Sequence, residues 1–281
     1  MAHALHVDGP DPAFVERLLD VALASRDRLF AIAGLQGSGK STLAARMVDL
    51  AASRGLRVVA LSLDDFYLDR PQRLALARDV HPLLATRGPP GTHDVELMIE
   101  TLDALRGDYA VRVPRFDKLT DRRLSEIDWL HVDRCDLAIV EGWCLKVPAE
   151  DATTLAMPLN AVERDEDADG AWRTYCNHAL GRDYPKLWSR LPNLLWLAPP
   201  CFDVVPEWRW QQECALRDAR PDVGGMSRSE IDRFVQLFER TSRRAIATLP
   251  SIAQHVVHLD AQRRPDPDDV ARLRPPPTID A

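Results

Sequence analysis

Several features that mark secreted, membrane-bound or zinc-binding proteins are missing from this 281-residue sequence. No apolar run approaches the roughly 20 residues that a membrane-spanning helix needs, and the N-terminus lacks the basic start and apolar block of a secretion signal. The five cysteines form no CxxC pair, and the eight histidines show no HExxH spacing. These absences predict a cytoplasmic protein with reduced thiols, no membrane partner and no structural zinc.

A surplus of positive charge is also absent. The formal net charge is −7, from 36 lysines and arginines against 43 aspartates and glutamates. We therefore expect no general affinity for nucleic acid or for anionic membranes. Apolar residues make up 46% of the chain and charged residues 28%, which is typical of a globular protein. The length allows one large α/β domain or two small ones.

Short apolar runs alternate with helical patterns along the chain. The runs are typical of strands buried on both faces, and they cover residues 29–33, 56–63, 135–140, 194–198 and 255–259. Helical patterns lie at residues 11–28, 43–48, 95–105, 172–191, 205–220 and 227–249, and a further short strand at 109–113. The alternation predicts an α/β fold with a mostly parallel sheet and helices on both faces. Ligands of such sheets bind beyond the carboxyl ends of the strands.

Composition suggests where the domain begins and ends. We expect a single domain over residues 1–270, with a helical leader at residues 1–28 and a lid at about residues 205–226. Residues 271–281 include three consecutive prolines and are predicted to be a disordered tail. Residues 148–170 are acidic and lack periodicity. They are predicted to be an exposed excursion, with a surface for a partner protein as the alternative.

Residues 34–41 match the phosphate-binding pattern G-x-x-x-x-G-K-[ST] at every fixed position. The pattern follows a predicted strand and opens a predicted helix, a context that disfavours an ordinary glycine-rich turn. Glycines let the backbone point its N–H groups inward, and the helix adds its positive end. Lys40 is expected to reach the outer phosphates, and Ser41 to ligate Mg²⁺. The sequence therefore predicts a nucleoside triphosphate site at Gly34, Gln36, Gly37, Ser38, Gly39, Lys40, Ser41 and Thr42.

Carboxylates follow two of the predicted strands. Asp64 and Asp65 end the run at residues 56–63, beside the expected position of the γ-phosphate. We predict that Asp64 is the general base and that Asp65 caps the next turn or borders the acceptor. Glu141 ends the run at residues 135–140 and is predicted to hold Mg²⁺, directly or through water. A salt-bridged glutamate at the strand end is the alternative for Glu141.

Polar loops supply candidates for binding the acceptor. Arg87 and His93 are expected to face an anionic or polyhydroxylated acceptor, whereas Asp94 has either this role or that of a helix N-cap. Arg115 and Lys118 lie in a segment of dense mixed charge. Such a segment is either a solvated loop or a clamp for a carboxylate, which guanidinium geometry suits.

A helical pattern near the C-terminal third carries several arginines. Arg209, Glu213 and Arg217 share one helical face, with Arg220 nearby. This face is either an exposed, salt-bridged surface or part of a mobile lid. A lid would bring Arg209 or Arg217 onto the transferring phosphoryl group.

In this order, the motifs resemble those of P-loop small-molecule kinases related to uridine kinase, pantothenate kinase and phosphoribulokinase. The resemblance is closest to plant-type D-glycerate 3-kinases and their fungal and bacterial relatives. It rests on residues 34–42, 62–67, 87–94, 114–118, 141–143 and 208–213. It implies a three-layer P-loop fold with a helical lid, and an acceptor activated by Asp64 and bordered by the Asp94 segment and the 115–118 loop. The sequence departs from the pattern at Phe116, where tyrosine is common, and in a shorter loop between Lys118 and Arg122.

These observations together predict an ATP-dependent kinase that uses Mg²⁺ and acts on a small hydroxy acid. D-glycerate, converted to 3-phosphoglycerate, is the expected acceptor. A kinase for a nucleoside, pantothenate or a sugar phosphate is one alternative, and a regulatory P-loop ATPase is another. The predicted catalytic residues are Lys40, Asp64, Arg209 and Arg217, and the predicted acceptor residues are Asp65, Tyr67, Arg87, His93, Asp94, Arg115 and Lys118. The sequence predicts no oligomeric state.

Overall fold

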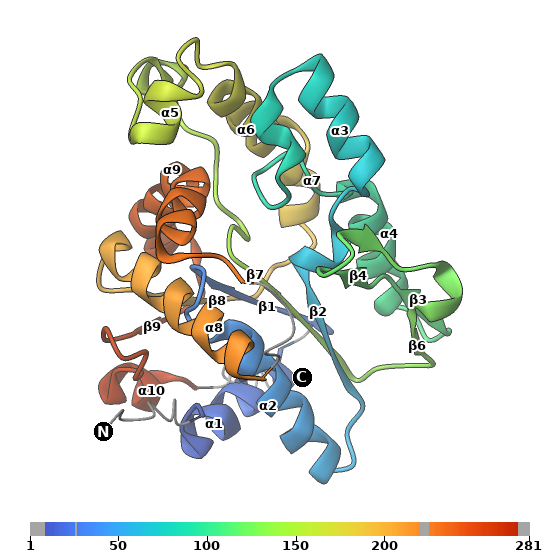
Figure 1. Cartoon of the computed structure of the whole chain (residues 1–281). Coiled ribbons are helices and arrows are strands. Elements are labelled where there is room, and N and C mark those ends of the chain that lie inside the picture. Colours follow the sequence, from blue (N-terminus) through green and yellow to red (C-terminus); the bar gives the residue numbers. More distant parts are fainter. Residues whose placement is uncertain (1–8, 26, 220–224, 275–281) are drawn as a thin grey trace.

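The computed structural model describes residues 9–25, 27–219 and 225–274 (Figure 1). Its centre is a five-stranded sheet in the order β2-β7-β1-β8-β9, in which every neighbouring pair is parallel. The strands are β1 (Leu29–Gly34), β2 (Val58–Ser62), β7 (Leu137–Gly142), β8 (Leu194–Ala198) and β9 (His255–His258). The α/β prediction is confirmed, and each of the five predicted apolar runs overlaps one strand of this sheet.

The burial of the strands explains why their sequences are continuously apolar. All residues of β1, β7 and β8 are buried, because these three strands occupy the middle of the sheet. The edge strand β2 alternates between buried and partly buried positions. Side chains of β1 point alternately to the two faces of the sheet. Phe30 and Ile32 therefore join one core, and Leu29, Ala31 and Ala33 join the other.

Helices cover both faces and make three layers. The core around Phe30 includes α1 (Pro12–Leu23), α2 (Lys40–Ser53) and α10 (Pro267–Arg272), which Figure 1 shows together below the sheet. The opposite core includes α4 (Val95–Leu105), α6 (Ala171–Arg182), α7 (Tyr184–Trp188) and α9 (Arg228–Ile252). Helix α8 (Val205–Ala219) contributes to both cores through Val205 and Trp208. No helix in the described ranges has the length and apolar character of a membrane span.

The connection from β2 to β7 carries the segments that were predicted to bind the acceptor. It contains the 3₁₀-helices η1 (Leu63–Phe66), η2 (Pro82–Ala85) and η3 (Glu126–Asp128), with α3 (Arg70–Asp79) and α4. Two small antiparallel sheets follow α4, pairing β3 (Val111–Val113) with β6 (Leu130–Val132) and β4 (Phe116–Asp117) with β5 (Arg122–Arg123). The strand predicted at residues 109–113 is thus present, but it lies outside the central sheet.

The connection from β7 to β8 differs from two predictions made from the sequence. It contains η4 (Ala152–Ala156), α5 (Ala161–Asp165), α6 and α7. The single helix predicted at residues 172–191 is two helices, because Pro185 lies at the start of α7 and supplies no N–H to continue α6. The excursion at residues 148–170 is not wholly exposed, since Glu163 and Asp167 are fully buried. Arg240 pairs with Glu163 at 2.6 Å, and Arg173 pairs with Asp167 at 2.9 Å.

The two ends of the predicted domain are only partly described. Residues 1–8 of the helical leader and residues 275–281 of the tail lie outside the described ranges. Residues 271–274 were also assigned to the tail, yet α10 extends to Arg272 and Leu273 is buried against the α1–α2 core. A capping box at Ser227 begins α9, which was predicted as the helical pattern at residues 227–249, and the Glu230 N–H donates to the Ser227 hydroxyl.

Candidate active site

The phosphate loop connects β1 to α2 and encloses the Ser38 side chain. Gly37 and Gly39 have φ of 75° and 89°, a left-handed conformation that glycine adopts at little cost. A Cβ atom on Gly34 would lie 2.5 Å from the Ser38 hydroxyl oxygen, so no larger residue fits there without movement. Gly39 is also the N-cap of α2, and no side chain among the described residues caps this helix. An uncapped helix N-terminus is suited to binding phosphate.

Several buried polar atoms around this loop have no hydrogen-bond partner in the part of the chain that is described. They are both side-chain polar atoms of Gln36, the Ser38 hydroxyl and Glu141 Oε2. Buried polar groups in proteins almost always have a partner. These atoms therefore fit a ligand with many donors and acceptors, such as a nucleoside triphosphate with its metal ion.

The three predicted phosphate and metal residues are in contact. Lys40 and Ser41 begin α2, and Glu141 lies beside Ile32 near the carboxyl end of β7. The Ser41 hydroxyl donates to Glu141 Oε1 at 2.7 Å, and Lys40 Nζ lies 3.9 Å from Glu141 Oε2. Hydroxyl and carboxylate oxygens are the ligands that Mg²⁺ prefers, so this pair of side chains fits that ion.

Asp64 lies in η1, directly after the neighbouring edge strand β2. Lys118 Nζ donates to its carboxylate at 2.6 Å, and the Tyr67 hydroxyl is a second donor. Burial raises the pKa of Asp64, but Lys118, Tyr67 and the Lys40 ammonium outweigh it and lower the pKa to about 2. Asp64 is therefore ionised at neutral pH and lies within the electrostatic influence of the phosphate-loop lysine.

Asp65, the next residue, has different partners. Its Oδ2 accepts hydrogen bonds from the Ser62 N–H at 3.1 Å and from Arg115 Nη1 at 2.8 Å. The first bond completes a capping box for η1. Burial raises the pKa of Asp65 in spite of the Arg115 guanidinium. Asp65 thus holds η1 in place, and its ion pair occupies the guanidinium of Arg115.

Two more predicted acceptor residues are paired within the protein. Arg87 donates to Asp121 Oδ1 at 2.7 Å and to the Lys118 carbonyl at 3.3 Å. Asp94 is the N-cap of α4, accepting from the Leu97 N–H at 3.2 Å, and its other oxygen accepts from Arg123 at 2.9 Å. Sequence reasoning could not pair these groups, because the partners lie 29 or more residues apart. Both carboxylate oxygens of Asp94 have structural partners.

His93 and Tyr67 lie next to Asp64. Their ring centroids are 5.0 Å apart, and the two residues form an isolated antiparallel bridge. His93 Nδ1 is hydrogen-bonded to the Tyr184 hydroxyl at 2.6 Å, whereas the buried Nε2 has no partner in the described structure. Burial lowers the pKa of His93 to about 4 despite the opposing influence of Asp64. The imidazole is therefore neutral at physiological pH.

Trp143 is a residue of this region to which the sequence analysis gave no role. It follows Glu141-Gly142 at the end of β7 and is 3% exposed. Its indole N–H is buried and has no partner among the described residues, although its ring packs edge-on against Phe238 at 5.1 Å. The same Phe238 ring lies close to Gly88. A Cβ atom added to Gly88 would be 2.7 Å from Phe238 and 3.7 Å from the Tyr67 hydroxyl. Trp143 was part of a recognised motif, but only the fold shows its N–H to be unpaired.

Most of the chain is similar to proteins of known sequence or structure. No family model matches it. An uncharacterized kinase of Schizosaccharomyces pombe is 33% identical over 220 residues, which cover 75% of this chain and 78% of that protein. The chain belongs to the P-loop kinases. It is an ATP-dependent kinase, and the resemblance inferred from its motifs is confirmed.

D-glycerate 3-kinases are among the relatives of this kinase. The chloroplastic D-glycerate 3-kinase of Arabidopsis thaliana is 28% identical over 230 residues, which cover 76% of this chain and 46% of the plant protein. The chain therefore spans less than half of that relative. The solved D-glycerate 3-kinase of Cryptococcus neoformans has the same fold, with a TM-score of 0.72 and 23% identity over 92% of this chain and 98% of that one.

Helix α8 supplies the arginines that were predicted to serve the phosphoryl group. Arg209 Nη2 donates to Glu213 at 2.8 Å, while its buried Nη1 lacks a partner within the described residues. Arg217 packs over the Trp210 ring at 5.5 Å and donates to the Met226 carbonyl. Arg209 therefore has one buried nitrogen to which the described structure gives no partner. Arg220 lies outside the described ranges.

Arg263 was not found by sequence reasoning, although it contacts both the phosphate loop and α8. Its Nε donates to the Gly37 carbonyl, and its terminal nitrogens donate to Gln211 Oε1 at 2.9 Å and to the Trp208 carbonyl at 3.2 Å. It lies in the loop between β9 and α10, far along the chain from both partners. No local sequence pattern marks such a residue.

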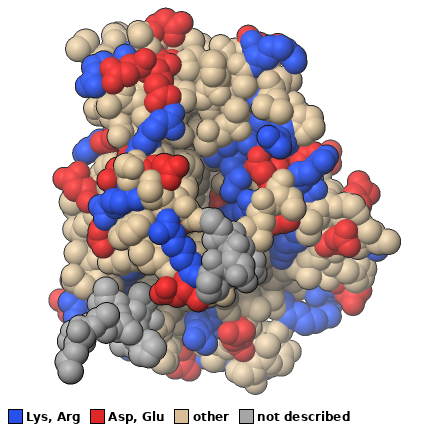
Figure 2. All heavy atoms as spheres, viewed as in Figure 1, with Lys and Arg blue, Asp and Glu red and all other residues tan. Residues whose placement is uncertain are grey.

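The structure brings most of the predicted residues to one edge of the sheet. After the roles predicted for them, we name Lys40, Ser41 and Glu141 the nucleotide side, and Asp64, Tyr67, His93 and Lys118 the acceptor side. Arg115 and Asp94 lie in the same region but contact protein groups, and Thr42 is exposed on α2. In the space-filling view, basic side chains border a depression between the side of α9 and the side of α3 and β4 (Figure 2).

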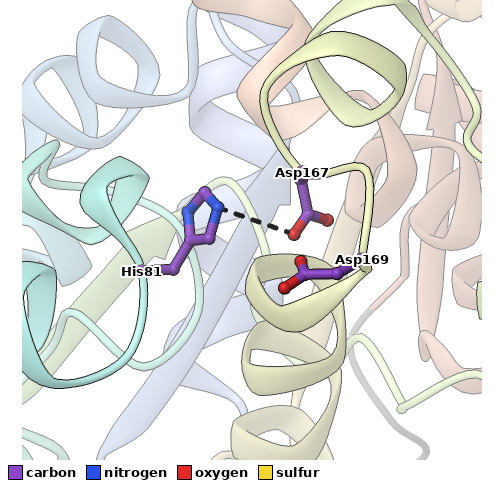
Figure 3. Close-up of side chains that lie close together, drawn as sticks. All are labelled: His81, Asp167 and Asp169. Carbon is purple, nitrogen blue, oxygen red and sulfur yellow. Dashed lines mark ion pairs between the residues drawn. The ribbon is translucent and has the colours of Figure 1, made fainter.

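A second cluster of titratable side chains lies outside these residues. His81, which precedes η2, faces Asp167 and Asp169 at the start of α6 (Figure 3). His81 Nε2 lies 3.9 Å from Asp167 Oδ1. The Asp167 oxygens already accept from the Trp172 N–H at 2.7 Å and from Arg173 at 2.9 Å. The positive Arg173 opposes a cation here, so we assign the cluster to the support of α6.

Proposed function

We propose that this kinase transfers the γ-phosphoryl group of ATP to a hydroxyl of a small hydroxy acid, and that the acceptor is D-glycerate. The observation that carries the proposal is the Lys118–Asp64 pair beside Lys40. Asp64 is an ionised carboxylate, and the Lys118 ammonium that pairs with it could instead bind the carboxylate of an acidic substrate. The phosphate-loop Lys40 is close enough to influence Asp64. The similarity to plant and fungal D-glycerate 3-kinases supports this choice of acceptor.

The nucleotide side provides the groups that hold the triphosphate. The backbone of the loop and the start of α2 face its phosphates, and Lys40 contributes a positive charge near the outer phosphate. Ser41 and Glu141 would hold Mg²⁺, which when bound neutralises charge on the phosphate oxygens. Their oxygens contact one another at 2.7 Å, so a bound ion would replace that hydrogen bond.

On the acceptor side, Asp64 accepts the proton of the attacking hydroxyl. While Lys118 is paired with Asp64, the pKa of about 2 makes Asp64 a weak base. An acceptor with a carboxylate would attract the Lys118 ammonium away from Asp64. Because burial raises the pKa of Asp64, loss of this neighbour would make the carboxylate more basic at the moment the acceptor is in place. This coupling favours an acidic acceptor over a neutral one.

Neutral groups would orient the rest of the acceptor. The Trp143 N–H and His93 Nε2 are both buried and unpaired within the described chain, and hydrogen bonds to a hydroxyl would satisfy them. Leaving a buried polar group unsatisfied costs about 1–3 kcal/mol. An acceptor that lacks a second hydroxyl should therefore bind more weakly than D-glycerate, which has hydroxyl groups on two carbons.

An assay of ADP release with a panel of acceptors tests the proposal. The panel contains D-glycerate, L-glycerate, lactate, uridine, pantothenate and ribulose 5-phosphate, each at saturating ATP and Mg²⁺. We expect turnover with D-glycerate to exceed that with every other acceptor, and the product to be 3-phosphoglycerate by NMR. Faster turnover with uridine, pantothenate or the sugar phosphate would refute the hydroxy acid assignment.

A further inference from the structure

Arg263 links the phosphate loop to helix α8, two elements that would have to act together in phosphoryl transfer. All of its guanidinium nitrogens are used, with acceptors on Gly37 of the phosphate loop and on Trp208 and Gln211 of α8. Its guanidinium carbon also lies 5.3 Å from the centroid of the Trp208 ring. Burial lowers the pKa of Arg263, but arginine remains charged at any physiological pH.

The backbone conformation of Arg263 is unusual and is held by hydrogen bonds within its loop. Its φ is 66°, in the left-handed region that residues other than glycine rarely adopt. Such conformations cost free energy and persist where surrounding contacts enforce them. Within the loop, the Arg263 N–H donates to the Asp260 carbonyl at 2.9 Å, and the adjacent Arg264 N–H donates to Asp260 Oδ1 at 2.9 Å. The loop thus directs this one arginine toward Gly37.

The phosphate loop and α8 are already in close contact at the point that Arg263 joins. A Cβ atom on Gly37 would lie 2.7 Å from Trp208 Cβ and 2.9 Å from the Trp208 carbonyl carbon. Trp208 is 1% exposed, and its indole N–H donates to the Ala261 carbonyl at 2.8 Å. The first turns of α8 are therefore packed against the phosphate loop and the loop after β9.

We propose that Arg263 is a positioning residue that sets the place of Arg209 relative to the phosphate loop. Arg209 follows Trp208 directly, so the contacts that fix Trp208 also fix the backbone of Arg209. The unpaired Nη1 of Arg209 is the group that would stabilise the transferring phosphoryl group. The inference rests on the proposed function, since it assumes that Arg209 acts on the phosphoryl group. The hydrogen bonds of the Arg263 guanidinium in the described structure all go to protein acceptors, so its effect on the reaction would pass through Arg209.

Two substitutions remove or shorten the Arg263 side chain. Arg263→Gly keeps the left-handed backbone accessible, so its effects report on the lost guanidinium rather than on strain. Arg263→Lys keeps the charge but cannot reach three acceptors at once. The control is Arg264→Ala, because the exposed Arg264 side chain pairs with Asp260 at 2.7 Å and has no contact with the phosphate loop or α8 in the described structure.

Steady-state kinetics should separate positioning from general damage. We expect Arg263→Gly to lower kcat about tenfold, with KM for the acceptor changed less than about twofold, because the loss falls on transition-state contacts. Arg263→Lys should recover part of kcat, and Arg264→Ala should match wild type. An equal loss of kcat in the Arg264→Ala control, or a change confined to the acceptor KM, would overturn the proposal.

A double-mutant cycle with Arg209→Ala is the decisive experiment. If Arg263 acts through Arg209, the double variant Arg209→Ala/Arg263→Gly should have the same kcat as Arg209→Ala alone. Multiplicative losses would show that the two residues act independently. Thermal unfolding of each variant establishes that it is folded at the assay temperature.

The cycle also distinguishes this proposal from the assignment of D-glycerate. It is measured with whichever acceptor of the panel gives the fastest turnover, so a different acceptor leaves the comparison intact. The affinity for a non-hydrolysable ATP analogue, measured by calorimetry, provides a readout that needs no acceptor. We expect Arg263→Gly to weaken that affinity by about tenfold or less, because the Gly37 contact is only one part of the phosphate loop. Unchanged affinity together with unchanged kcat would refute the role of Arg263.

Discussion

The nucleotide side and the acceptor side of this site differ in what their polar groups contact. Around the phosphate loop, Gln36, Ser38 and Glu141 have buried atoms without hydrogen-bond partners in the described chain. On the acceptor side, Arg87 and Arg115 are already paired with carboxylates of neighbouring loops. The comparison indicates that a charged side chain near a site is not available to a ligand when it is already paired within the protein. Lys118 is also paired, with Asp64 at 2.6 Å, so it can bind a substrate only if this pair opens. The buried atoms of this side that have no partner in the described structure are neutral nitrogens of His93 and Trp143.

The largest effect is expected from substitution of Asp64, the proposed general base. Asp64→Asn removes the proton acceptor but keeps the shape of the side chain. We expect kcat to fall about 1,000-fold, within the range of general-base catalysis, while the affinity for ATP changes by less than about threefold. The measurement is kcat by ADP release and Kd for ATP by calorimetry. Losses of similar size in both quantities would assign Asp64 a structural role.

Loss of the phosphate-loop lysine should lower turnover far more than it weakens acceptor binding. Lys40→Met removes the ammonium that lies 3.9 Å from Glu141 and influences Asp64. We expect kcat with saturating acceptor to fall about 100-fold, the scale of one electrostatic contact to the transition state. KM for D-glycerate should stay within about twofold of wild type. Undiminished turnover would refute the role of the loop in phosphoryl transfer.

Lys118→Met tests the acceptor side and has a pH signature. Removing the ammonium should raise KM for D-glycerate at least about tenfold, because a charge-assisted contact to the carboxylate is lost. It also removes the neighbour that lowers the pKa of Asp64, so that pKa rises from about 2 under the influence of burial. Since the base must be ionised, the acidic limb of kcat/KM against pH should shift to higher pH. An acidic limb unchanged from wild type would contradict the Lys118–Asp64 coupling.

The neutral groups of the acceptor side should contribute less. Trp143→Phe removes the unpaired N–H and keeps most of the packing against Phe238. We expect about a tenfold rise in KM for D-glycerate, consistent with one hydrogen bond. Trp188→Phe is a matched control, because its buried N–H is also unpaired within the described chain but belongs to α7. Equal kinetic effects of the two substitutions would remove Trp143 from the site.

The smallest kinetic effect is expected at the second carboxylate of η1. Asp65→Asn weakens the ion pair with Arg115 and should lower the free energy of unfolding by about 1–2 kcal/mol. Its kcat should remain within about threefold of wild type, in contrast to Asp64→Asn. Urea unfolding and ADP release measure the two quantities. A kcat as low as that of the Asp64 variant would mean that the two aspartates act as a unit.

The fold and the nucleotide side were predictable because their signals are local. Continuous apolar runs marked the five strands, and the spacing from Gly34 to Ser41 fixed the phosphate loop. The partners of Arg87, Arg115 and Asp94 were not predictable, since each pair joins loops whose relative positions depend on the whole fold. The burial of Glu163 was missed for the same reason, as its partner Arg240 lies on a distant helix.

No role was predicted from the sequence for two residues that the folded chain makes candidates. Arg263 lies in a loop of mixed charge that resembles many solvated loops, and only its contact with Gly37 distinguishes it from Arg264. Trp143 occupied a recognised motif, yet the sequence could not show that its N–H is unpaired. The contacts of Arg263 and the unpaired N–H of Trp143 are properties of the folded chain, so neither could be read from the sequence.

A crystal structure of the kinase with Mg²⁺, a non-hydrolysable ATP analogue and D-glycerate tests the central claim most directly. The account predicts the 3-hydroxyl of D-glycerate within about 2.6–3.2 Å of an Asp64 oxygen, the hydrogen-bond reach of a general base. It also predicts that Lys118 has left Asp64 for the carboxylate of the acceptor. An acceptor bound away from Asp64, with the Lys118–Asp64 pair intact, would contradict the account.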